Sequence, residues 1–107
     1  MEISKVLLDS VVVIKSPVFN DERGSVQETL NHRLLELLNI KKDSPFALTY
    51  YSLSNKNVVR GLHYQIGIKQ SKLVTVVHGS VLDVVLDMRK NSNTFGKYDS
   101  VNLSKEE

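Results

Sequence analysis

The sequence contains no cysteine and no tryptophan, and it has only two prolines among 107 residues. The absence of cysteine excludes a disulfide framework, a thiolate zinc site and a cysteine nucleophile, and it fits a reducing compartment. Acidic and basic residues nearly balance, at 12 and 14, so the charge of +2 indicates neither a nucleic-acid partner nor a membrane surface. No apolar run approaches the ~18 residues of a membrane span, and the start of the chain lacks the build of a signal peptide. We therefore expect a soluble, cytoplasmic protein with no membrane or nucleic-acid partner.

The composition that remains is that of an ordinary globular chain. Hydrophobic residues make up 41% and charged residues 24%, which argues against disorder. The length allows a single domain spanning 1–107.

Short runs of β-branched and aromatic residues alternate with turn residues along most of the chain. A turn every roughly 8–12 residues is typical of sandwiches and barrels of antiparallel strands. The turn Asp21–Gly24 ends in a glycine that readily takes a positive φ. The turn His78–Ser80 joins two of the runs and predicts a hairpin between them. The strand-like runs are 11–14, 46–54, 58–65, 72–77, 81–87 and 98–103.

One segment carries helical spacing instead. Asn31 is a favourable N-cap, and the leucines that follow it predict one short amphipathic helix over 31–38. Generous counting gives six or seven strands, whereas a closed antiparallel barrel usually needs about eight. We therefore expect either that another chain completes the barrel or that the C-terminal end is missing.

His63 is the one histidine that lies within a strand-like run. Gly61 lies on the same face of that strand, and a small neighbour leaves room for a ligand. Taken alone, the pattern favours a simpler explanation, a half-buried histidine with a hydrogen-bond partner. Gln65 stands where a β-barrel metal site would place a second histidine, and no nearby cysteine or histidine replaces it. We therefore expect no metal.

Three cationic residues, Arg23, Arg60 and Lys72, occupy strand-like or turn-adjacent positions. Arginine suits bidentate contact with phosphate, and lysine suits stabilisation of a developing oxyanion. A joint role in binding and catalysis is one interpretation. For any one of them, an ordinary surface charge is the simpler alternative.

Six motifs follow one another in chain order: Asp21–Gly24, Glu28, Val59–Gln65, Lys72–Val74, His78–Arg89 and Thr94–Lys97. Taken together, they resemble one known family, the dTDP-4-dehydrorhamnose 3,5-epimerases, which are cupin-fold enzymes of dTDP-rhamnose synthesis for cell-surface polysaccharides. The resemblance covers nearly the whole chain and implies a mainly β, cupin-like antiparallel β-sandwich (jelly roll), incomplete at the C-terminus. It also implies a cytoplasmic homodimer that needs no cofactor.

The resemblance also implies roles for five residues. His63 matches the general base that removes a proton beside the C4 ketone of a dTDP-4-keto-6-deoxy sugar, and Lys72 matches the cation near the ketone oxygen. Arg23, Glu28 and Arg60 match contacts to the nucleotide sugar, some of which usually reach across a dimer interface. A cation in a dry site stabilises an enolate, and neutral imidazole is a suitable base at neutral pH. We expect His63 to face the largest concavity, within reach of Lys72 and Arg60.

The sequence also departs from the family pattern. Ser25 and Val26 stand where the family commonly has two aromatic residues, and Leu48, Thr49 and Tyr50 replace its Gln-Asp-Asn. Family members continue well past the position of Glu107. That part holds the tyrosine proton donor, a second histidine and the aspartate that orients the base.

Two alternatives to a 3,5-epimerase stay open. A 3,4-ketoisomerase of a similar sugar is also a cupin, but such enzymes tend to have a second histidine soon after the Arg-Gly pair, where this chain has Tyr64 and Gln65. An inactive nucleotide-sugar-binding or assembly module is the other, because half of the catalytic set has no counterpart in these residues.

Overall fold

The computed structural model describes residues 1–40, 46–67 and 69–105, and these form three β-hairpins and one short helix. The hairpins pair β1 with β2, β3 with β4 and β5 with β6, all antiparallel, as three separate two-stranded sheets. The expected antiparallel, mainly β fold with one short helix is confirmed. The bounds are β1 Glu2–Leu7, β2 Val11–Lys15, β3 Val18–Asp21, β4 Gly24–Gln27, α1 His32–Leu37, β5 Ser80–Leu86 and β6 Tyr98–Ser104.

Local sequence signals explain the elements near the N-terminus. The turn between β3 and β4 has Asp21 opposite Gly24, and Gly24 takes a φ of 133° that favours glycine. The helix begins where the sequence predicts, because the Asn31 side chain accepts a hydrogen bond from the backbone N–H of Leu34 at 2.9 Å. Acidic residues are absent from its first turn, so this cap is the main stabilisation of its N-terminus.

The hairpin predicted between 72–77 and 81–87 is wrong. The strand β5 does form, but its partner is β6, with Ser80 opposite Ser104 and Leu86 opposite Tyr98. The runs 46–54 and 72–77 form no strand and belong to none of the three sheets. β-Branched residues favour an extended backbone, but a strand also needs a neighbouring edge to pair with, and the local pattern does not identify that edge.

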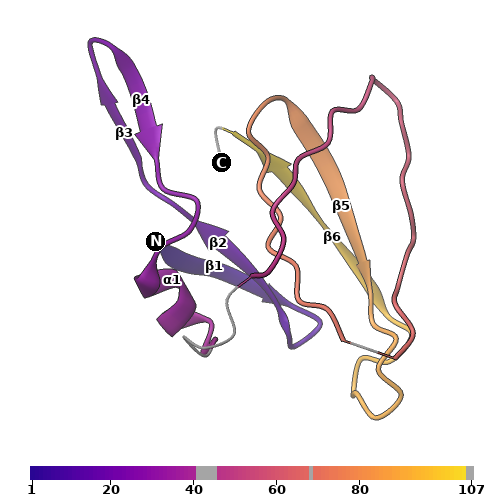
Figure 1. Cartoon of the computed structure of the whole chain (residues 1–107). Coiled ribbons are helices and arrows are strands. Elements are labelled where there is room, and N and C mark those ends of the chain that lie inside the picture. Colours follow the sequence, from indigo (N-terminus) through magenta and orange to yellow (C-terminus); the bar gives the residue numbers. More distant parts are fainter. Residues whose placement is uncertain (41–45, 68, 106–107) are drawn as a thin grey trace.

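The buried core of the described residues is small. Leu7 and Leu34 are the buried apolar side chains, at 7% and 1% exposure. In Figure 1 the β3–β4 hairpin projects away from the β5–β6 hairpin, and residues 46–67 and 69–79 make a wide excursion on the side of β5 and β6. None of the helices in the described residues is long and apolar enough to cross a membrane.

Candidate active-site residues and the Asp87 cluster

Arg23 lies at the tip of the β3–β4 hairpin, in an ion pair with Asp21. One carboxylate oxygen of Asp21 accepts hydrogen bonds from Nε and Nη2 of Arg23, at 3.1 and 2.6 Å. The hydrogen bonds from Arg23 lower the pKa of the Asp21 carboxyl below its ordinary value, so Asp21 is ionised at neutral pH. The Arg23 side chain is 90% exposed and therefore available to a ligand.

Glu28 follows β4 and is tied to two neighbours. Its Oε2 accepts a hydrogen bond from the Asn31 amide at 2.6 Å, and its backbone carbonyl accepts one from the Ser16 hydroxyl, also at 2.6 Å. The residue that caps α1 therefore also orients the Glu28 carboxylate. The hydrogen bond from Ser16 closes the base of the β3–β4 hairpin, and Glu28 stays there.

Arg60, His63 and Lys72 are exposed, and all three lie in residues 46–67 and 69–79, which form neither helix nor strand and are called here the extended segment. The Nε atom of Arg60 donates a hydrogen bond to the Ser54 hydroxyl at 2.9 Å. His63 is exposed rather than half-buried, and no hydrogen bond holds its ring among the described residues. A Cβ built on Gly61 would meet the backbone N of His63 at 3.5 Å and its Nδ1 at 3.9 Å, which are ordinary contact distances, so the φ of 101° rather than lack of room favours glycine there.

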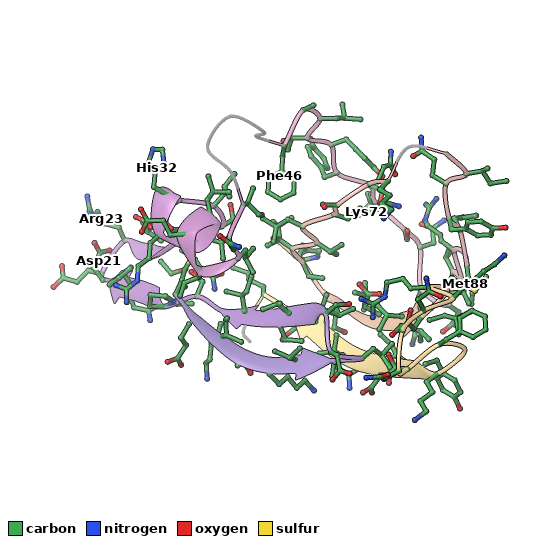
Figure 2. The ribbon with its side chains drawn as sticks, turned by 90° about the horizontal axis from the view of Figure 1, so that it is seen from below. Asp21, Arg23, His32, Phe46, Lys72 and Met88 are labelled. Carbon is green, nitrogen blue, oxygen red and sulfur yellow. The ribbon has the colours of Figure 1, made fainter. Side chains whose placement is uncertain are left out.

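The structure does not bring all of the predicted site residues together. Figure 2 shows Arg23 at one end of the molecule and Lys72 well away from it, on the extended segment. Two surface hollows of the described residues are lined by side chains other than His63. The segment that carries His63 has no sheet partner among the described residues to build walls around it, and the expectation that His63 faces the largest concavity stays a prediction. One hollow is lined by Met1, Glu2, Lys15, Ser16, Pro17, Val18 and Arg33, and the other by Asp9, Arg89, Asn91, Ser92 and Asn93.

A buried carboxylate, to which the sequence analysis assigned no role, organises the loop between β5 and β6. Asp87 is 5% exposed and accepts hydrogen bonds from Nε of Arg89 at 3.0 Å, from Ser92 Oγ at 2.6 Å and from Thr94 Oγ1 at 2.5 Å. These partners, Arg89 foremost, hold the pKa of Asp87 far below its usual range. Arg89 and Thr94 also donate to the carbonyl oxygen of Leu8, at 3.1 and 3.4 Å.

We call these four residues, Asp87, Arg89, Ser92 and Thr94, the Asp87 cluster. It joins the β5–β6 loop to the β1–β2 turn across more than 80 residues of sequence. In the sequence, the close spacing of one carboxylate, one guanidinium and two hydroxyls within a loop is the signal that could have indicated this cluster. In the described residues no three His, Asp or Glu side chains gather in a way that could hold a metal ion.

Comparison with known proteins gives this arrangement a context. The family model described as dTDP-4-dehydrorhamnose 3,5-epimerase matches residues 5–107. The enzyme of that name from Shigella flexneri is 42% identical over 107 residues, which are 99% of this chain and 59% of the relative. The one from Methanothermobacter thermautotrophicus is 39% identical over 102 residues, 95% of this chain and 54% of the relative.

Two solved structures resemble the fold as well. The crystal structure of dTDP-4-dehydrorhamnose 3,5-epimerase from Elizabethkingia anophelis matches with a TM-score of 0.77 at 36% identity, over 99% of this chain and 58% of that one. The enzyme from Bacillus anthracis, solved with TDP and PPi bound, matches with a TM-score of 0.67 at 26% identity, over 98% and 60%. The chain thus spans a little more than half the length of the relatives it matches. Because the family model matches nearly every residue, the chain belongs to the dTDP-4-dehydrorhamnose 3,5-epimerase family.

Proposed function

We propose that the protein epimerises a dTDP-4-keto-6-deoxy sugar at C3 and C5, without a cofactor, in the cytoplasm. The observation that carries this proposal is the family match over residues 5–107, which includes all five predicted site residues. The Bacillus anthracis relative was solved with TDP and PPi bound, which supports a thymidine nucleotide as the carrier of the sugar.

In the proposed reaction, His63 is the base and Lys72 the oxyanion stabiliser. The C4 carbonyl acidifies the hydrogens on both adjacent carbons, so one base can serve C3 and C5 in turn. When the imidazole takes the proton, the electron pair of the broken C–H bond forms an enolate whose charge gathers on O4. A lysine ammonium beside O4 stabilises that charge. Return of a proton to the opposite face of the carbon inverts the centre and restores the ketone.

We also propose that the protein is a homodimer with shared sites. Arg23 and Lys72 lie apart within one chain, and the β3–β4 hairpin that carries Arg23 projects outward. A second copy can bring these groups together if the hairpin of one protomer reaches His63 and Lys72 of its partner. The exposed edges of three two-stranded sheets also favour pairing with another chain.

Proton exchange tests the chemistry directly. The complete gene product, given the 4-keto sugar nucleotide in D₂O, should incorporate deuterium at C3 and C5, as followed by NMR. His63→Ala should lower this rate by about 10²- to 10⁴-fold, because that is the usual contribution of a general base. His32→Ala, which removes an exposed histidine on α1, is the control and should exchange normally.

The other functions predict different products. A ketoisomerase would move the carbonyl from C4 to C3, and a binding module would bind the nucleotide with no exchange at all. Retained exchange in His63→Ala would remove His63 from the mechanism.

Mixed dimers test the shared site. In a dimer of one His63→Ala chain and one Arg23→Ala chain, a shared arrangement leaves one of the two sites intact, so mixing two weakly active variants should restore activity. If each site lies within one protomer, mixing restores nothing. A monomer by light scattering would also rule out the shared arrangement.

A further inference from the structure

The β3–β4 turn holds one edge of the Arg23 guanidinium group. β3 ends at Asp21 and β4 begins at Gly24, so the turn is short and Asp21 faces back along it. The carboxylate accepts the backbone N–H of Arg23 through Oδ1 at 2.8 Å, and Nε and Nη2 through Oδ2 at 3.1 and 2.6 Å. Three contacts to one carboxylate fix both the backbone and the side chain of Arg23.

Stability does not explain this ion pair. The two side chains are 90% and 51% exposed, and ion pairs with that much solvent contact contribute little to folding. Their geometry has a different consequence. A guanidinium group has five N–H donors, and the contacts to Asp21 occupy one on Nε and one on Nη2. Among the described residues, the Nη1–Nη2 edge keeps donors with no other partner, in the fork that fits a phosphate.

We propose that Asp21 is a positioning residue, which holds Arg23 so that its Nη1–Nη2 edge faces the diphosphate of the nucleotide-sugar substrate. This inference rests on the proposed function, in which Arg23 contacts that substrate. An arginine already held in one geometry loses less side-chain freedom when it binds an anion.

Positioning and simple electrostatics predict opposite changes in substrate affinity when the charge of Asp21 is removed. A carboxylate near an anionic diphosphate repels it, so removal of that charge alone should tighten binding. If Asp21 positions Arg23, its removal should weaken binding instead. The lowered pKa of Asp21 supports the role, since the carboxylate stays charged wherever the enzyme is assayed near neutral pH.

The test compares two neutralising substitutions in the same turn. Asp21→Asn keeps an oxygen for the backbone N–H of Arg23 but loses the charged clamp. Glu22→Gln removes an equal charge from an exposed side chain that forms no ion pair among the described residues. Binding of dTDP to the complete gene product is measured by titration calorimetry. We expect Asp21→Asn to weaken binding about 3- to 10-fold, the range given by loss of one ordered side chain, and Glu22→Gln to leave it unchanged or tighter.

Kinetics and a double substitution separate positioning from other effects. Asp21→Asn should raise KM with kcat unchanged, because the diphosphate is bound equally in the ground and transition states. In an Arg23→Ala background, Asp21→Asn should cause no further loss. If Asp21→Asn binds dTDP more tightly, or with the same affinity as Glu22→Gln, the inference is overturned. If Arg23→Ala weakens dTDP binding in the same experiments, the proposed function still stands. If Arg23→Ala binds dTDP as tightly as the parent protein, Arg23 does not contact the substrate and the inference fails. The deuterium exchange at C3 and C5, with its dependence on His63, tests the epimerase activity separately.

Discussion

Asp87 is the buried charged side chain of the described residues, and its hydrogen bonds hold the β5–β6 loop to the β1–β2 turn. Asp87→Asn would remove the charge that pairs with Arg89 and would place an N–H₂ group among donors. We expect the melting temperature to fall by about 5 °C or more. Asp99→Asn is the matched control, because Asp99 is exposed and its carboxylate accepts only the backbone N–H of Ser100. The control should melt within about 1 °C of the parent protein.

The same carboxylate predicts how stability depends on pH. The folded pKa of Asp87 lies below the ordinary value of about 3.9 for an unfolded aspartate, so folding is favoured by this group above that pH. Its contribution is lost progressively as the pH falls below that value. We expect melting temperatures measured from pH 7 down to pH 2 to drop steeply below pH 4 in the parent protein and more gently in Asp87→Asn. Parallel curves would show that other carboxylates dominate acid unfolding.

The sequence predicts which residues have suitable chemistry better than it predicts where those residues lie in the fold. His63, Lys72 and Arg60 were chosen because their chemistry suits proton removal and anion binding, and because their motifs match a family. Where they lie depends on pairing between distant segments, and the structure leaves their segment without a sheet partner. Asp87 lies within the motif His78–Arg89, but its importance comes from burial, which local spacing does not reveal.

At the scale of one element, α1 presents a clean contrast between two leucines. Leu34 is 1% exposed and Leu37 is 40% exposed, on the same six-residue helix. Leu34→Ala should lower the free energy of unfolding by about 2–5 kcal/mol, because it leaves a cavity in a small core. Leu37→Ala removes the same atoms from a partly exposed position and should cost under about 1 kcal/mol. Denaturant titrations of the two variants measure the difference, and equal losses would mean that helix propensity rather than burial determines the effect.

The sequence predicts the helix correctly but predicts one hairpin wrongly. The helix depends on neighbouring residues, whereas the hairpin depends on which distant segment pairs with β5. A cap at Asn31 and leucines within the next few residues define a helix without reference to the rest of the chain. The turn Asp21–Gly24 is equally local, and its hairpin formed. The pairing of β5 with β6 spans a polar loop, and a nearer run at 72–77 offered the same strand-forming residues. Sequence distance alone therefore selected the wrong partner.

For the molecule as a whole, exposed apolar surface is the dominant feature. Tyr51 and Val59 are 91% and 90% exposed, and Leu53 and Ile66 are each 86% exposed. Surface of this kind marks places where other protein packs. The 107 residues produced by themselves should therefore bind the dye ANS and self-associate as their concentration rises, as seen by fluorescence and sedimentation.

Substitution identifies the surface responsible. A double variant, Leu53→Ser with Ile66→Ser, should bind less dye and associate less, whereas Ser25→Ala in β4 should change neither. A stable monomer that ignores the dye would mean that the extended segment covers itself in solution.

The hydrogen bonds that the Asp87 cluster sends to the β1–β2 turn end on a main-chain carbonyl, that of Leu8. A carbonyl is offered by every amino acid, so a substitution at position 8 leaves the link intact as long as the new residue accepts the φ of 50° that Leu8 adopts. The other end of the link depends on side chains, and there Arg89 and Thr94 have few substitutes. Related sequences should therefore keep Arg89 and Thr94 in the loop and vary more at position 8 in the turn. Substitutions at the two ends of the contact should not be correlated.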